Sequence, residues 1–263
     1  MYCGIDLGSR TVKVALLKGK DLFQFKRFVT VDFYRQYGRI SGGELVVNLE
    51  KLGIAGVTAL VTTGYGRQTV KTKGARVISE IKAHVLGAVF KTGLLDFTLL
   101  DLGGQDSKVA LVRGGRMADF QTNDKCAAST GRYLENMATV LGLSMKELGK
   151  YHHDPVKLSA TCAIFGETEL IGRMVEGHSI PSLAAGVNYT IFKRIRPMLV
   201  NLKSSTLVFT GGVAYNEALV TIIKKKLGTG VVVPENPEYA GAIGCCLAAR
   251  AENENWFRGV RGV

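Results

Sequence analysis

Short stretches of apolar residues predict two pairs of strands, and the second pair is nearly a copy of the first. The first pair is Tyr2–Asp6 and Val12–Leu17, and the second is Thr98–Asp101 and Ser107–Val112. In both pairs a tight loop joins the strands, and the first strand ends in Asp-Leu-Gly. A β-hairpin that returns after about a third of the chain predicts two duplicated lobes.

Helical periodicity and further apolar runs predict the remaining elements. In the first lobe we expect a strand at Val57–Val61 and a helix over Ser79–Lys91. In the second lobe we expect helices over Ala127–Leu141, Cys162–Glu176, Ser182–Asn201, Ala214–Leu227 and Glu238–Arg250, and strands at Thr206–Phe209 and Gly230–Val233. The chain is thus expected to have an α/β fold with an N-terminal lobe over residues 1–95 and a C-terminal lobe over residues 96–263. The last helix could pack back on the first lobe.

Composition places the chain among ordinary globular proteins. Of its 263 residues 46% are hydrophobic and 21% are charged, which is far from the composition of disordered or fibrous chains. The opening residues lack the basic and apolar segments of a secretory signal, and no apolar run approaches the length of a membrane span. We therefore expect a cytoplasmic protein without a membrane partner, whose five cysteines are reduced, metal-bound or buried.

The formal net charge of +12 raises the question of nucleic-acid binding. Lys and Arg are scattered along the chain, and the densest run, Lys224–Lys226, fits the C-terminal end of a helix, where cations are favourable. No recognised nucleic-acid module is present. We expect no nucleic-acid partner, and the basic charge instead suits an acidic protein partner or the phosphates of a nucleotide.

The two strand–loop–strand repeats carry the residues with candidate chemistry. An Asp at the end of a buried strand, followed by a glycine loop, places a carboxylate and several free backbone N–H groups at one point, which suits Mg²⁺ and phosphate. We expect Asp6 and Asp101 to organise the metal and Gln105 to position an attacking water. The loop residues expected to bind the nucleotide are Gly8, Ser9, Arg10, Thr11 and Lys13 in the first repeat and Gly103 and Gly104 in the second.

Two further glycine segments complete the set. Gly211, Gly212 and Asn216 stand between a predicted strand and a predicted helix, where the absence of side chains lets a flat ring or a ribose approach the backbone. Gly241 lies in a small-residue segment that opens the last predicted helix and suits a hinge contact or plain helix packing. A Walker lysine motif is absent, which argues against the P-loop class.

The order and spacing of these four segments resemble the ATPase domain shared by actin, hexokinase and the large heat-shock ATPases. The resemblance spans nearly the whole chain. It implies a two-lobed actin-like fold, built from duplicated ribonuclease H-like lobes, with ATP in the interlobe cleft. In that superfamily the two Asp-Gly hairpins bind phosphates and Mg²⁺, and the Gly-Gly loop binds adenosine.

A narrower resemblance rests on four short segments: Thr63–Arg67 (TGYGR), Asp101–Asp106 (DLGGQD), Asn123–Ala128 (NDKCAA) and Cys162–Glu167 (CAIFGE). They look like the ATPase activators of 2-hydroxyacyl-CoA dehydratases, relatives of the ATPase subunits of benzoyl-CoA reductase. The resemblance implies a homodimer with one [4Fe-4S] cluster between the subunits, held by Cys126 and Cys162 of each chain. A two-fold axis through the cluster doubles two thiolate ligands to the four it requires.

Taken together, these features predict an ATP-hydrolysing electron activator. It would accept an electron from reduced ferredoxin or flavodoxin and pass it to an iron–sulfur acceptor enzyme, either a dehydratase or a reductase component. A small-molecule kinase of the same fold is the first alternative, but it does not explain the two cysteine segments. A filament-forming or scaffold ATPase is the second alternative.

Several residues are expected to be structural or have no assigned role. Cys3, Cys245 and Cys246 are expected to be buried and structural, because adjacent helical residues make a poor chelate. Ser129 stands where the family usually has glycine, and the effect on Cys126 stays open. The stretch Glu80–His84 resembles a family feature without an assigned role.

Overall fold

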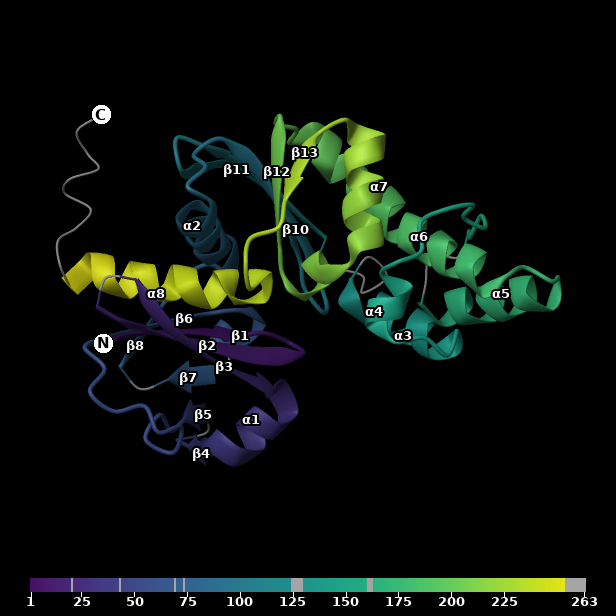
Figure 1. The fold of residues 1–263 in the computed structure, drawn as a ribbon. Helices are drawn as coiled ribbons and strands as arrows, with labels where there is room; N and C mark the ends of the chain where they lie inside the picture. The colour runs from purple at the N-terminus through teal and green to yellow at the C-terminus, as the bar shows by residue number, and fades with distance from the viewer. Residues whose placement is uncertain are drawn as a thin grey trace. The chain divides into compact units, whose positions relative to one another are not determined.

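The computed structural model describes residues 1–19, 21–42, 44–68, 70–72, 74–123, 130–159 and 163–253. The chain divides into two compact units. Unit 1 contains Met1–Leu94 and the segment from Glu238 onward, and unit 2 contains Leu95–Pro237. Figure 1 shows the elements of both units.

Each unit is built around a five-stranded mixed sheet, and the two sheets have the same strand order. In unit 1 the order is β3 (Leu22–Val29), β2 (Thr11–Lys18), β1 (Tyr2–Leu7), β6 (Ala59–Thr63) and β8 (Ala75–Val77). In unit 2 the order is β11 (Arg116–Asn123), β10 (Ser107–Arg113), β9 (Phe97–Leu102), β12 (Thr206–Thr210) and β13 (Gly230–Val232). In both sheets the first three strands are antiparallel and the last three are parallel. The predicted duplication of the hairpin is confirmed.

The sheet of unit 1 is covered on both faces. Because side chains alternate along a strand, Cys3, Ile5 and Leu7 of β1 enter one apolar cluster, which also contains Phe33 of α1 (Thr30–Tyr37). Tyr2, on the other face, packs with residues of α8 (Ala240–Asn253). Asp6 shares that face with Tyr2, so its carboxylate points to the α8 side. A small second sheet contains β4 (Gly38–Ser41), β5 (Glu44–Val47) and β7 (Val70–Thr72).

Glycines bring α8 very close to β1 and to α2 (Glu80–Thr92). A Cβ atom on Gly244 would lie 1.8 Å from the carbonyl oxygen of Ala83, and one on Gly87 would lie 2.0 Å from that of Ala240. A Cβ on Gly4 of β1 would lie 2.1 Å from the carbonyl oxygen of Ala242. Backbone packs on backbone at all three points, which fixes α8 against β1 and α2.

Unit 2 buries a large core between its sheet and its helices. These helices are α3 (Gly131–Val140), α4 (Met145–Leu148), α5 (Ala163–Val175), α6 (Ile180–Asn201) and α7 (Glu217–Leu227). The longest, α6, begins at the N-cap Ser179 with a proline in its first turn, a favourable start for a helix. Its buried residues pack with Leu100 and Leu102 of β9.

Several predicted boundaries are wrong by a few residues. The strand predicted at Val57–Val61 is β6, which spans Ala59–Thr63 and starts two residues later than expected. The helix predicted from Ala214 starts at Glu217, because Gly212–Tyr215 form a 3-10 turn and Asn216 caps the helix. The last helix starts at Ala240 after the 3-10 turn Pro237–Tyr239. Of the helix predicted over Ala127–Leu141, residues 127–129 lie outside the described residues.

No helix in the described part of the chain combines the length and the apolar composition that crossing a membrane requires.

Candidate functional site

Asp6 lies at the end of β1 with only 3% of its surface exposed. It pairs in register with Lys13 of β2, whose Nζ is 3.8 Å from Asp6 Oδ2. Among the described residues Asp6 Oδ1 has no hydrogen-bond donor, although it is buried. A buried carboxylate oxygen without a donor is costly, so this atom is typical of a site that a ligand completes. Carboxylate oxygens suit Mg²⁺, so Asp6 fits the expected metal.

The loop after Asp6 is held by the start of α1. Thr30 Oγ1 donates to the carbonyl oxygen of Gly8 at 2.7 Å, and the Thr30 N–H donates to that of Arg10 at 3.1 Å. Gly8 has no room for a side chain, since a Cβ there would lie 2.6 Å from the Thr11 carbonyl oxygen. Ser9 is half-buried and Arg10 is exposed. The predicted first phosphate loop is therefore a fixed turn with an open outer edge.

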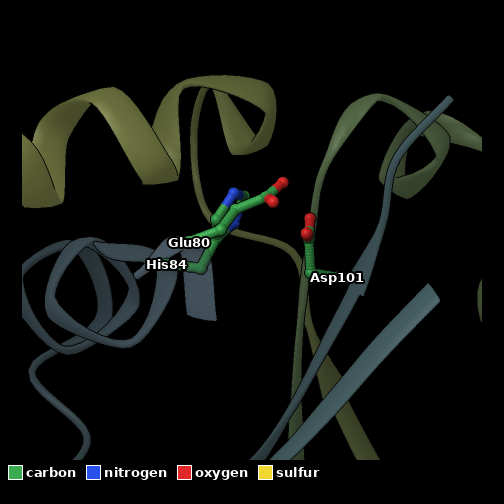
Figure 2. Close-up of side chains that lie close together, drawn as sticks. All are labelled: Glu80, His84 and Asp101. Carbon is green, nitrogen blue, oxygen red and sulfur yellow. The ribbon is translucent and has the colours of Figure 1, made fainter. Parts of the chain in front are cut away.

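Two glycines and a histidine surround the Asp6 carboxylate in unit 1. A Cβ on Gly64, whose φ is +98°, would lie 2.6 Å from Asp6 Oδ1. A Cβ on Gly241, in the first turn of α8, would lie 3.2 Å from Asp6 Oδ2 and 2.8 Å from His84 Nε2. Figure 2 shows His84 and Glu80 one turn apart on α2.

Asp101 is the equivalent residue of unit 2, with 2% of its surface exposed. It pairs in register with Lys108 of β10 and with Thr210 of β12. The Thr210 hydroxyl lies 3.4 Å from Asp101 Oδ1. The ammonium group of Lys108 forms an ion pair with Asp106, which lies two residues earlier, in the loop before β10.

The loop from Gly103 to Asp106 is joined to the start of α3. The Gly103 N–H donates to the Asp106 carbonyl oxygen at 3.1 Å, which closes the turn. The N–H groups of Gly131 and Arg132 donate to the carbonyl oxygens of Gly103 and Gly104 at 2.9 and 3.2 Å. The side chain of Gln105, at the tip of this loop, is half-buried. A displacement of the loop would therefore act directly on α3.

The predicted adenosine loop starts with a strained glycine. Gly211 has φ +87°, and a Cβ there would lie 2.4 Å from the Leu102 carbonyl oxygen and 2.6 Å from Asp101 Oδ1. Gly212, in contrast, is exposed, and a Cβ there would meet no atom within 4 Å. Of these two adjacent positions, the fold requires glycine at 211 and not at 212.

Asn216 has a different role from an open loop residue. Its Oδ1 accepts from the Leu219 N–H at 2.8 Å, and its Nδ2 donates to Asn188 Oδ1 at 2.8 Å. The side chain is 4% exposed and is committed to capping α7 and to joining it to α6. Asn216 therefore positions the loop, and its expected contact with a nucleotide stays a prediction.

The two units share a Thr-Gly pair that was not predicted as a repeat. Thr63 pairs in register with Asp6, and Thr210 pairs with Asp101. In each case the next residue, Gly64 or Gly211, has positive φ and passes within Cβ contact of the Asp carboxylate. The detectable signal was the Thr-Gly pair after a buried strand in both halves of the chain.

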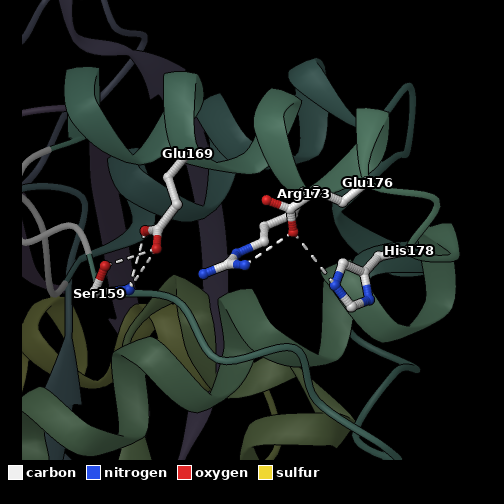
Figure 3. A network of polar contacts seen from close by, with 5 residues as sticks. All are labelled: Ser159, Glu169, Arg173, Glu176 and His178. Carbon is white, nitrogen blue, oxygen red and sulfur yellow. Dashed lines mark hydrogen bonds and ion pairs between the residues drawn. The ribbon is translucent and has the colours of Figure 1, made fainter.

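The proposed metal ligands Cys126 and Cys162 lie outside the described residues. The described chain resumes as helix one residue after Cys162, at Ala163, and α3 starts five residues after Cys126, at Gly131. Before the Cys162 segment, Ser159 is held by Glu169 of α5, which accepts from its N–H at 2.8 Å and from its hydroxyl at 2.7 Å (Figure 3). Further along, the Glu176 carboxylate lies 2.8 Å from Arg173 and 3.7 Å from His178.

The other three cysteines are buried in unit 1. Burial raises the pKa of the Cys3 thiol to about 12 and holds the pKa values of Cys245 and Cys246 well above their usual range. The Cys246 thiol lies 3.0 Å from the carbonyl oxygen of Ala15. Neutral, buried thiols are unreactive and poor metal ligands, which agrees with the structural role expected for them.

Comparison with known proteins finds a family and relatives that match nearly the whole chain. The model of the BadF/BadG/BcrA/BcrD ATPase family matches residues 3–249. The (R)-2-hydroxyglutaryl-CoA dehydratase activating ATPase of Acidaminococcus fermentans is 34% identical over 94% of this chain and 95% of its own length.

Two solved structures are similar in fold. The activator of the 2-hydroxyisocaproyl-CoA dehydratase from Clostridium difficile, with bound ADPNP, superposes with a TM-score of 0.82 at 30% identity, covering 100% of this chain and 99% of that one. MreB 5 of Spiroplasma citri, bound to AMPPNP, has a TM-score of 0.55 at 11% identity over 98% of both chains. The similarity to MreB 5 concerns the fold alone. The chain has an actin-like ATPase fold with two mixed α/β lobes.

Proposed function

Because this chain belongs to the BadF/BadG/BcrA/BcrD ATPase family, we propose that it is an ATP-hydrolysing electron activator. It accepts a low-potential electron from ferredoxin or flavodoxin and transfers it to a partner metalloenzyme such as a 2-hydroxyacyl-CoA dehydratase. The single observation that carries the ATPase part is the repeated Asp strand, with a buried Asp6 oxygen that no described residue satisfies. The relatives that activate dehydratases support the choice of partner.

In this proposal each hairpin has a share in nucleotide binding. Asp6 and Asp101 hold Mg²⁺ through carboxylate oxygens, and the metal would neutralise phosphate charge. The backbone N–H groups of Gly8 to Thr11 and of Gly103 and Gly104, with Lys13, bind phosphate oxygens. Gln105 orients the attacking water, and Gly211 and Gly212 leave room for adenosine. Gly241 lets α8 lie close to Asp6, because a Cβ atom at this position would be only 3.2 Å from Asp6 Oδ2.

The electron-transfer part assigns Cys126 and Cys162 as ligands of a [4Fe-4S] cluster shared by two subunits. The cluster would supply one-electron chemistry at low potential. The hydrogen bonds from Gly131 and Arg132 to the Gly103–Gly104 loop support a coupling between nucleotide binding and the cluster. They join the proposed phosphate hairpin to the helix that follows Cys126. A change of nucleotide could thereby move the segment that carries a cluster ligand.

An exposed apolar face of α5 supports the homodimer. Ile171, Met174 and Val175 are 47%, 36% and 83% exposed, and their spacing places them on one side of the helix. Phe165, three residues after Cys162, is 71% exposed. Exposed apolar patches of this kind mark protein–protein contacts, and this one lies on the helix that begins one residue after a proposed cluster ligand.

Metal analysis of cysteine variants tests this proposal. Anaerobically reconstituted protein should contain about four iron atoms per dimer. Cys126→Ala and Cys162→Ala should each lose this iron and keep ADPNP binding, because the phosphate hairpins lie elsewhere in the chain.

Cys245→Ala is the matched control and should keep the iron, since its thiol is buried in the core of unit 1. Iron at four per monomer, or iron retained in Cys126→Ala and lost in Cys245→Ala, would contradict the ligand assignment.

A further inference from the structure

His84 is a buried histidine that the proposed mechanism has not used. It lies on α2 one turn after Glu80, and 3% of its surface is exposed. Its neighbours along the helix, Ala83 and Ala88, are small and fully buried. An imidazole at such a position costs more to bury than an aliphatic side chain of the same size, so its chemistry needs an explanation.

The imidazole edge faces the Asp6 carboxylate across Gly241. The position that a Cβ on Gly241 would take is 2.8 Å from His84 Nε2, 3.1 Å from His84 Cδ2 and 3.2 Å from Asp6 Oδ2. The glycine thus leaves open the space in which these two polar groups approach each other. A ring nitrogen of His84 and a carboxylate oxygen of Glu80 lie within 4.8 Å of each other (Figure 2).

The three groups around Asp6 divide its two oxygens between them. Lys13 Nζ lies 3.8 Å from Oδ2. His84 Nε2 and Oδ2 both border the position that a Cβ on Gly241 would take. Oδ1 is on the side of Gly64 and has no donor among the described residues. Lys13 and His84 are therefore neighbours of one carboxylate oxygen, while the other oxygen is left for a ligand. Because α2 and α8 touch backbone to backbone at Gly87 and Gly244, His84 has a rigid support.

We propose that His84 is a positioning residue for Asp6, which fixes the carboxylate so that Oδ1 is presented to the Mg²⁺ of the bound nucleotide. This inference rests on the proposed nucleotide site. A group behind a metal-binding carboxylate changes metal affinity without touching the metal or the nucleotide. His84 should therefore matter for the Mg²⁺-dependent part of nucleotide binding and not for the rest.

The test measures ADPNP affinity as a function of Mg²⁺ concentration, and again in EDTA. In His84→Leu, which keeps the volume, the Mg²⁺ concentration for half-maximal effect should rise about tenfold. The affinity in EDTA should be unchanged. His84→Gln, which can replace the ring nitrogen as a donor, should restore most of the Mg²⁺ dependence. Gly241→Ala, which places a methyl group in the open space, should behave like His84→Leu.

His178→Leu is the matched control, because it removes a half-exposed imidazole from the other unit and should leave the Mg²⁺ dependence unchanged. A folded His84→Leu variant with wild-type Mg²⁺ dependence would overturn the inference, as would an equal loss of affinity with and without Mg²⁺. Should His84→Leu not fold, His84→Gln and Gly241→Ala decide. Absence of ADPNP binding in the wild-type protein would instead overturn the proposed function.

Discussion

The two buried aspartates show how the same residue in the same strand register acquires different surroundings. Lys13 lies beside Asp6, with 3.8 Å between Nζ and Oδ2, whereas the equivalent Lys108 turns to Asp106. Asp101 has the Thr210 hydroxyl at 3.4 Å. The equivalent lysines thus form different ion pairs: Lys13 with the strand residue Asp6, and Lys108 with the loop residue Asp106.

Gly211 and Gly212 are adjacent, yet they should respond differently to the same added methyl group. Gly211→Ala should lower the stability of the protein by about 2 kcal/mol or more, because φ is +87° and the methyl group would meet Leu102 and Asp101. Gly212→Ala should keep stability within about 0.5 kcal/mol.

The proposed adenosine contact predicts that Gly212→Ala nevertheless weakens ADPNP binding about tenfold, or about 1.4 kcal/mol. Thermal unfolding and nucleotide titration of the two variants check this pair. Full ADPNP affinity in Gly212→Ala would remove the loop from the nucleotide site.

The buried thiols should make stability depend on alkaline pH. Burial raises the pKa of the Cys3 thiol in the folded protein to about 12, from the ordinary value of 9.0. Because the folded state favours the neutral thiol, its contribution is complete below about pH 9 and is lost as pH rises toward 12, at about 1.4 kcal/mol per pH unit.

Urea unfolding under reducing conditions, at several pH values above about 8, should give a shallower loss of stability for Cys3→Ala than for the wild type. Equal slopes for the two proteins would show that Cys3 is not buried as described.

At the scale of elements, the contact of α8 with α2 depends on missing side chains. Gly244→Ala should destabilise the protein by about 3 kcal/mol, because its Cβ would lie 1.8 Å from a backbone oxygen that cannot move alone. Gly172→Ala is the matched control, also within a helix, where a Cβ meets nothing within 4 Å.

The control should gain up to about 1 kcal/mol from helix propensity. Thermal unfolding of both variants checks the prediction, and an unchanged transition in Gly244→Ala would show that α8 and α2 are not in backbone contact.

Elements with a strong apolar pattern could be predicted from the sequence, and those without one could not. The strands β1, β2, β9 and β10 are mostly buried, so their apolar runs stand out. The third strand of each antiparallel set, β3 or β11, was missed, because most of its residues are exposed and it lacks the buried apolar run of the central strands. Helix α1 was missed for the same reason, as it buries Phe33 alone.

The same limit applies to the candidate site. Asp6, Asp101 and their glycine loops are contiguous in sequence and were predicted from local pattern. Gly64, Thr30 and Gly131 reach these loops from distant parts of the chain. Their contribution depends on strand register and on helix docking, which local periodicity does not encode.

At the scale of the whole molecule, the two units have one sheet topology but differ in how the chain builds them. Unit 2 is continuous, from Leu95 to Pro237, and carries a helical core of its own. Unit 1 is assembled from both ends of the chain, and its α8 covers the β1 face that carries Asp6. The two units thus share their strand order and the aspartate on the central strand, and they differ in the helices around the sheet.

The discontinuity of unit 1 has a consequence for synthesis on the ribosome. The strand that bears Asp6 is translated before unit 2, and the helix that packs on its Asp6 face is translated after all of unit 2. Until residues 240–253 emerge, Tyr2 and Gly4 lack their packing partners and Gly241 is not yet beside Asp6. A nascent chain can therefore complete unit 2 before it completes unit 1. The surroundings of Asp6 in the proposed nucleotide site are therefore complete only after α8 has been translated.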